Sequence, residues 1–163
     1  MKLEVILNIL HYCIYKADYK LRLLFNKINP FMLIHKLPFQ KRRYEKLGID
    51  INKVVNQSFS DKRYGLSVMV AGGMIVGILF LLMMAFVLTV LKLTDIDVRL
   101  RITHFLFFGI TSSALCYLFV FRDEKYQAYF DDFDRWTKSE RKKYAWASLA
   151  FVIGVMVLFF WSL

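Results

Sequence analysis

Polar residues inside an apolar segment are the first place to look for chemistry in this chain. They are His104, Thr111, Ser112, Ser113 and Cys116. Such groups could line a path for protons or ions if they faced a cavity within a membrane. However, no Asp or Glu lies within the apolar segments, and Ser and Thr readily bond to their own helix backbone. A transport path thus stays an alternative, and we favour ordinary bonding at the membrane interface or between helices.

The other reactive residue types do not form a recognisable site. The three histidines do not stand at metal-ligand spacing from Cys13 or Cys116, and the aspartates at 131–134 lack the glycine turn of a calcium loop. The sequence contains neither a phosphate-binding glycine loop nor a serine in a nucleophile elbow. We therefore predict that the protein is not an enzyme and has no catalytic residues, no cofactor and no metal.

Composition places the chain in the membrane class. Of its 163 residues, 58% are hydrophobic and 17% aromatic, whereas soluble domains are about 45–50% apolar. The excess is concentrated in three runs without acidic or basic residues, at 66–91, 102–121 and 144–163. Each run is long enough for a helix to cross roughly 30 Å of hydrocarbon. The predicted fold is an all-α membrane protein with three transmembrane helices, an N-terminal amphipathic helix and a cytoplasmic loop helix.

The distribution of Lys and Arg predicts the orientation. Residues 1–65 and 122–143 contain 20 of the 23 basic residues, and residues 92–101 contain three. Basic loops stay in the cytoplasm. We therefore expect the N-terminus and the loop 122–143 inside a bacterial-type cytoplasmic membrane, with the C-terminus outside. The net charge of +10 has this simpler explanation, so nucleic acid is not an expected partner.

The N-terminal segment has a long helical stripe of apolar residues that ends before Asn29-Pro30. The stripe consists of Leu3, Leu7, Leu10, Ile14, Ala17, Leu21, Leu24 and Ile28. A narrow polar stripe, expected to face water, consists of Glu4, Asn8, His11, Asp18, Arg22 and Asn26.

Most of the circumference of this helix therefore requires burial. It could lie in the cytoplasmic headgroup layer, dock in a groove of another chain or a second copy, or pack on the protein's own cytoplasmic segments. For the docked alternative we predict a partner-binding face formed by Leu3, Leu7, Leu10, Ile14, Leu21 and Leu24.

Residues 1–65 are predicted to form one cytoplasmic region, whose later part is basic. Lys41, Arg42 and Arg43 are candidate contacts for lipid headgroups, although we favour a topology signal with ordinary solubility as their explanation. The spacing of Ser58 and Asp61 fits a capping pattern and predicts that the first membrane helix begins near residue 59.

The second cytoplasmic loop predicts an aromatic helix. Its aromatic side chains recur at helical spacing, at Tyr126, Tyr129, Phe130, Phe133 and Trp136. The first four are candidate partner-binding residues, unless the face docks within the chain. Thr137 and Glu140 form a possible capping box, so a further helix is expected to begin near residue 138 and to continue into the third span.

Small residues four apart occur in each span and allow helix backbones to approach closely. The candidate helix-packing positions are Gly73, Gly77, Gly109, Ser113, Ala150 and Gly154. The region 66–163 is predicted to be the membrane region. We expect a small membrane subunit that binds lipid and anchors or assembles other subunits, which could include copies of itself. The alternative is a channel, pore or transporter subunit acting as an oligomer.

Overall fold

In the computed structural model every regular element of the described residues, 2–28, 37–48, 50–95 and 101–163, is helical. The elements are α1 (Leu3–Ile28), α3 (Pro38–Lys46), α4 (Ile51–Ser60), α5 (Leu66–Thr94), α6 (Ile102–Cys116), η1 (Tyr117–Phe121), η2 (Arg122–Glu124), α7 (Lys125–Asp134) and α8 (Lys138–Ser162). Three helical stretches are long and apolar enough to cross a membrane, namely Leu66–Thr94, Ile102–Asp134 and Lys138–Ser162. This confirms the all-helical class and the three candidate spans. The first two helical stretches end later than the predicted runs, at Thr94 and Asp134, and the third begins earlier, at Lys138, and ends at Ser162.

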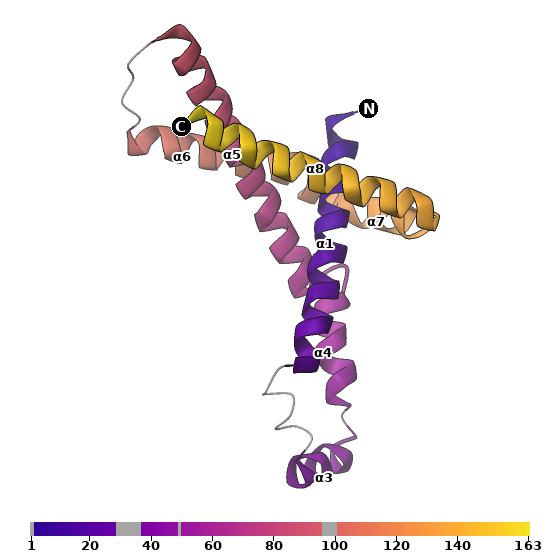
Figure 1. Ribbon diagram of the computed structural model, residues 1–163. Coiled ribbons are helices and arrows are strands. Elements are labelled where there is room, and N and C mark those ends of the chain that lie inside the picture. The colour runs from indigo at the N-terminus through magenta and orange to yellow at the C-terminus, as the bar shows by residue number, and fades with distance from the viewer. Residues whose placement is uncertain (1, 29–36, 49, 96–100) are drawn as a thin grey trace. The chain divides into compact units, whose positions relative to one another are not determined.

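The chain divides into two compact units. One consists of Met1–Cys13 with Gly72–Leu163, and the other of Ile14–Ala71. Figure 1 shows α1 and α5 as continuous helices, and each of them contributes to both units. Helix α1 has the predicted extent, whereas the Asn29-Pro30 stop signal lies outside the described residues.

The unit formed by Ile14–Ala71 corrects the predicted start of the first membrane helix. Ser58 lies inside α4, Asp61 terminates that helix, and α5 begins only at Leu66. The Asp61 carboxylate accepts hydrogen bonds from the backbone N–H groups of Arg63 and Tyr64, at 2.7 and 3.3 Å. Such local bonding offers the backbone an alternative to the helix. Asp61 therefore forms a turn that separates α4 from α5.

Gly65 closes the same turn, and it does so because it lacks a side chain. A Cβ atom at this position would clash with the backbone oxygen of Asp61 and would lie 2.9 Å from that of Phe59. Nearby, the Tyr15 hydroxyl donates to the Ser60 carbonyl at 2.8 Å, which satisfies a group at the end of α4.

In the other unit, the second apolar run forms α6 and continues into the π-helical turn η1. After η1 the chain is kinked at Asp123 and Glu124, which both adopt left-handed backbone conformations with φ of 58° and 53°. Non-glycine residues adopt this region at a cost of roughly 1–2 kcal/mol each. The kink therefore has to be held by the packing around it.

Helix α7 confirms the loop helix predicted from the aromatic spacing, and α8 begins where the capping box predicts. Thr137 accepts from the Glu140 backbone N–H, and the Glu140 carboxylate accepts from that of Thr137. Trp136 precedes this cap and stacks between the rings of Phe133 and Tyr144, with centroids 4.2 and 4.4 Å away. The turn from α7 to α8 is thus fixed by both polar and aromatic contacts.

Two contacts connect the candidate spans of this unit. The buried Ser112 hydroxyl of α6 lies 3.6 Å from the sulfur of Met83 in α5. The Lys92 ammonium donates to the Trp161 carbonyl at 2.8 Å and lies over the Trp161 ring. The last turns of α5 and α8 therefore meet at one end. Most of the short loop predicted after α5 lies outside the described residues.

Candidate functional site

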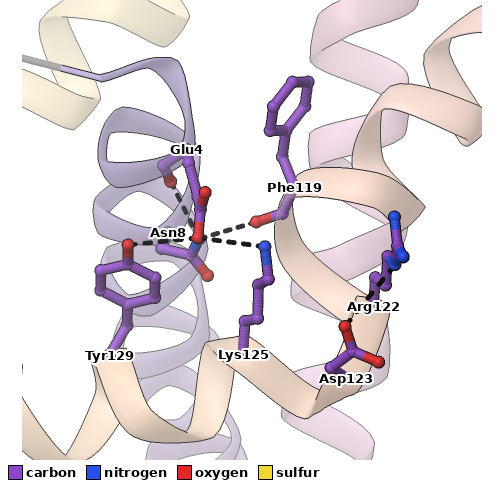
Figure 2. A network of polar contacts seen from close by, with 7 residues as sticks. All are labelled: Glu4, Asn8, Phe119, Arg122, Asp123, Lys125 and Tyr129. Atoms are coloured by element: carbon purple, nitrogen blue, oxygen red, sulfur yellow. Dashed lines mark hydrogen bonds and ion pairs between the residues drawn. The ribbon is translucent and has the colours of Figure 1, made fainter.

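The first turns of α1 lie against η1 and α7, and a buried asparagine forms the central contact. Asn8 is fully buried, and its Nδ2 donates to the Phe119 carbonyl at 3.0 Å and to the Glu4 carbonyl at 2.8 Å. Figure 2 shows Asn8 pointing from α1 toward η1. The last carbonyls of a helix have no partner within it. Asn8 therefore caps the end of the α6–η1 helix from a segment more than 100 residues away in the sequence.

Glu4 extends the contact to α7. Its carboxylate lies 3.5 Å from the Lys125 ammonium and accepts from the Tyr129 hydroxyl at 3.3 Å (Figure 2). Both partners are partly exposed, so solvent weakens the ion pair. Glu4 thus aligns the two helices and contributes less to stability than the buried Asn8 does.

His11 lies one turn further along α1 and is enclosed by aromatic rings. It is fully buried, and its ring centroid lies 5.1–5.6 Å from those of Phe121, Tyr126 and Phe130. Tilted and edge-on ring pairs at such separations are favourable. The aromatic face of α7 is therefore packed against α1 of the same chain.

Tyr12 completes the contact. Its hydroxyl donates to an Asp134 carboxylate oxygen at 2.7 Å, and its ring packs edge-on against Phe130, Phe133 and Trp136. Burial, together with the neighbouring carboxylate, raises the pKa of Tyr12 well above its usual value. A raised pKa means that the neutral hydroxyl stabilises the fold below about pH 10, and that this contribution is lost as the pH rises further. We call the contact of Glu4, Asn8, His11 and Tyr12 with η1 and α7 the α1 junction.

The α1 junction corrects the expectation that the polar stripe of α1 faces water. Asn8 and His11 belong to the stripe that was expected to face water, yet both are buried. The narrowness of that stripe was the available signal, since apolar residues flank it on both sides. The carbonyl that Asn8 caps could not be anticipated, because the π-helical end of η1 has no sequence motif of its own.

The predicted partner-binding residues of α1 differ in their exposure to solvent. Leu7 and Leu10 are buried, Ile14 is half-buried, and Leu21 and Leu24 are 52% and 56% exposed. Leu3 at the start of the helix is also exposed. A partner that contacted Leu7 or Leu10 would have to displace the packing already present.

The predicted aromatic face is mostly occupied within the chain. Tyr126, Phe130 and Phe133 are buried, and Tyr129 is half-buried beside Glu4. The structure therefore describes the docking within the chain that was one of the two alternatives, and binding of this face by another protein stays a prediction.

The small-residue positions are open. A Cβ atom added at Gly73, Gly77, Gly109 or Gly154 would meet none of the described residues within 4 Å. The remaining two, Ser113 and Ala150, are exposed. The close approach occurs instead at Gly72, where a Cβ atom would lie 2.5 Å from the Phe121 ring. Helix packing at the open positions stays a prediction that concerns lipid or a second molecule.

The predicted headgroup contacts lie on α3. Arg42 and Arg43 are exposed, whereas the side chain of Lys41 lies outside the described residues. Three polar residues of α6, His104, Thr111 and Ser113, bond to their own helix or its cap. His104 Nδ1 accepts from the Arg101 backbone N–H at 3.0 Å, and Thr111 donates to the Phe107 carbonyl.

Comparison of the chain with protein-family models, curated proteins and solved structures found no match. Across the part of the chain that the structure describes, no group of three His, Cys, Asp or Glu residues is placed to hold a metal ion.

Proposed function

We propose that the protein is a small integral membrane subunit of a bacterial-type cytoplasmic membrane, where it anchors or assembles a multiprotein complex. The three candidate spans and the asymmetry of Lys and Arg support the location and the inward-facing N-terminus. Lipid covers the spans, and the helices outside them provide the surfaces for other subunits.

One observation carries the proposal, namely the uneven exposure of α1. Its first turns are fixed at the α1 junction, whereas Leu21, Leu24 and Phe25 are 52–60% exposed further along the same helix. Large apolar residues that share a helix face are typical anchors for a groove in a partner. A helix held at one end and apolar at the other is suited to docking, because the partner need not order it first.

The experiment is gentle detergent extraction, followed by mass spectrometry of the proteins that co-purify. We expect specific subunits to be recovered with the wild-type protein and to be lost with Leu21→Asp or Leu24→Asp. Burying a carboxylate at a well-packed contact costs about 2 kcal/mol or more, so the partner should bind roughly 30-fold more weakly.

The matched control is Lys20→Asp, which introduces the same side chain at the neighbouring exposed position of α1. It should retain the partners. Recovery of a monodisperse monomer from wild type, or equal loss of partners with Lys20→Asp, would count against the proposal. If the purified protein instead conducts ions in liposomes and His104→Ala or Thr111→Val changes the flux, the transport alternative is favoured.

A further inference from the structure

Helix α3 combines exposed cations with an exposed aromatic ring. Arg42, Arg43 and Lys46 are exposed, and Phe39 is 74% exposed. The residues that flank the helix, Leu37 and Leu47, are 53% and 61% exposed. Isolated apolar residues on a surface are ordinary, but three of them on and around one basic helical turn require a common explanation.

The spacing of these residues places them on one face. Positions 39, 42, 43 and 46 are three or four apart, so their side chains are neighbours on the helix surface. Together with Pro38 they line a hollow of about 490 Å³. The hollow therefore has cationic side chains beside a ring and a proline, within a single helix of nine residues.

This combination has a specific chemical complement. Arginine and lysine bind phosphate oxygens through charge-assisted hydrogen bonds, and a phenyl ring gains free energy from acyl chains rather than from water. An anionic phospholipid offers both groups within a few Å, whereas a free phosphate offers only the first. Short basic helices with exposed aromatic residues bind the plane of a membrane in this way.

The covalent chain keeps α3 close to the proposed membrane. Nineteen residues separate Lys46 from Leu66, the first residue of the first candidate span, and ten of them form α4. At 1.5 Å per helical residue and about 3.5 Å for each of the others, the connection cannot exceed about 47 Å. An anchored chain therefore holds α3 at a high effective concentration near the bilayer surface.

We infer that α3 is a docking site for anionic phospholipid, with Arg42, Arg43 and Lys46 on the headgroup phosphate and Phe39 among the upper acyl carbons. The inference deepens the proposed function, since it requires the chain to be anchored in a membrane. The inference names the class of lipid that the subunit recognises in the cytoplasmic leaflet.

The test uses the full chain in nanodiscs, with Cys13 and Cys116 replaced by Ala and an environment-sensitive dye attached at Leu47→Cys. One set of discs contains phosphatidylcholine alone, and the other contains phosphatidylcholine with phosphatidylglycerol; both include brominated lipid as a quencher. We expect a blue shift and strong quenching only in the anionic discs. Each cation near an anionic surface contributes about 1 kcal/mol, so Arg42→Gln/Arg43→Gln should lower the ratio of docked to undocked α3 by roughly 30-fold. Phe39→Ser should reduce the quenching as well.

The control is Lys20→Gln/Lys53→Gln, which removes the same charge from two exposed positions on α1 and α4 and should leave the quenching unchanged. Equal quenching in both kinds of disc, or an equal effect of the control, would overturn the inference. Release of α3 by inorganic phosphate or by a short RNA at constant ionic strength would overturn it in favour of a free-anion or nucleic-acid site.

These outcomes can be told apart from failure of the proposed function. In one outcome, the protein stays in the bilayer and retains its partners while the docking of α3 is the same with and without anionic lipid. That outcome contradicts only the lipid inference. A chain that alkaline washing removes from vesicles contradicts the proposed function.

Discussion

At the scale of single residues, the most informative positions are buried polar ones. A polar group in an apolar environment is stable only when it is hydrogen-bonded, because burial without a partner costs roughly 1–3 kcal/mol in proteins. The Asn8 amide nitrogen meets this condition by donating to the Phe119 carbonyl, although the Asn8 Oδ1 is buried without a partner among the described residues, and the Tyr12 hydroxyl meets it through Asp134. Each bond has its two members in distant parts of the sequence, so these residues determine where α1 is held.

Asn8→Ala should therefore loosen the α1 junction. The substitution leaves the Phe119 carbonyl without its partner, at a cost of about 1–3 kcal/mol, which corresponds to about a five- to 150-fold rise in the detached population. Cys13 lies on the next turns of α1, and burial raises the pKa of its thiol, so the thiol reports detachment. The measurement is the rate at which a maleimide labels Cys13 in a Cys116→Ala background.

A matched control comes from the same helix. Lys20→Ala removes an exposed side chain and should leave the labelling rate of Cys13 unchanged. An unchanged rate in Asn8→Ala would show that Asn8 does not hold the helix.

At the scale of elements, the fold depends more on where each helix ends than on which segments are helical. Apolar runs specify long helices easily, but the direction of the next element depends on local chemistry. Asp61 ends α4 by bonding to its own turn, and the left-handed pair Asp123 and Glu124 kinks the chain after η1. The capping box at Thr137 starts α8. Of these three, the capping box was predicted at the correct position, because it is the only one with a fixed sequence pattern.

Two glycines in different settings, one in a turn and one inside a helix, should respond in opposite ways to alanine. Gly65→Ala places a Cβ atom against backbone oxygens of Asp61 and Phe59, so the turn must shift at a cost of about 1–3 kcal/mol. Gly73→Ala meets open space inside α5 and should stabilise the isolated protein by about 0.5–1 kcal/mol. The measurement is the midpoint of unfolding in mixed micelles with increasing dodecyl sulfate.

The same two substitutions can distinguish an effect on the stability of the isolated chain from an effect on its assembly with a partner. If Gly73 packs against a helix of a partner, Gly73→Ala should weaken co-purification although the isolated chain is more stable. Equal stabilisation by both substitutions would mean that the turn at Gly65 tolerates a side chain.

At the scale of the whole molecule, the three candidate spans define two sides. The bond from Lys92 to the Trp161 carbonyl places the ends of α5 and α8 together. The distribution of basic residues predicts that this side faces the exterior, since the segments on the other side contain 20 of the 23 Lys and Arg residues.

Three single-cysteine variants should therefore report the two sides of the membrane. Two of them are expected on the outer side and one on the inner side. Leu93→Cys and Leu163→Cys, both at exposed positions, should react with a membrane-impermeant maleimide added outside intact cells. Gln57→Cys in α4 should react only after the cells are opened, because it precedes the first span. The measurement uses a background with Cys13 and Cys116 replaced by Ala. Labelling of Leu93→Cys and Leu163→Cys from opposite sides would contradict both the Lys92 contact and the number of spans.

Much of the architecture follows from local patterns along the chain. Uninterrupted apolar runs predicted the three candidate spans, apolar periodicity predicted α1, and aromatic spacing predicted α7, because each signal is contained within one segment. The helices α3 and α4 were not predicted. Helix α3 is short, polar and basic and resembles a loop, whereas α4 does carry a helical signal, namely the apolar spacing of Ile51, Val54, Val55 and Phe59.

The sequence did not reveal which helix surfaces are packed against other segments of the same chain. The stripe with Asn8 and His11 appeared suited to water, and the leucines of α1 appeared equivalent along its length. Tertiary contacts bury residues 7–12 and leave Leu21 and Leu24 exposed, because the carbonyl of Phe119 in η1 and the rings of α7 contact that part of the helix. Burial is a property of segments brought together from distant positions, so periodicity within one helix cannot specify it.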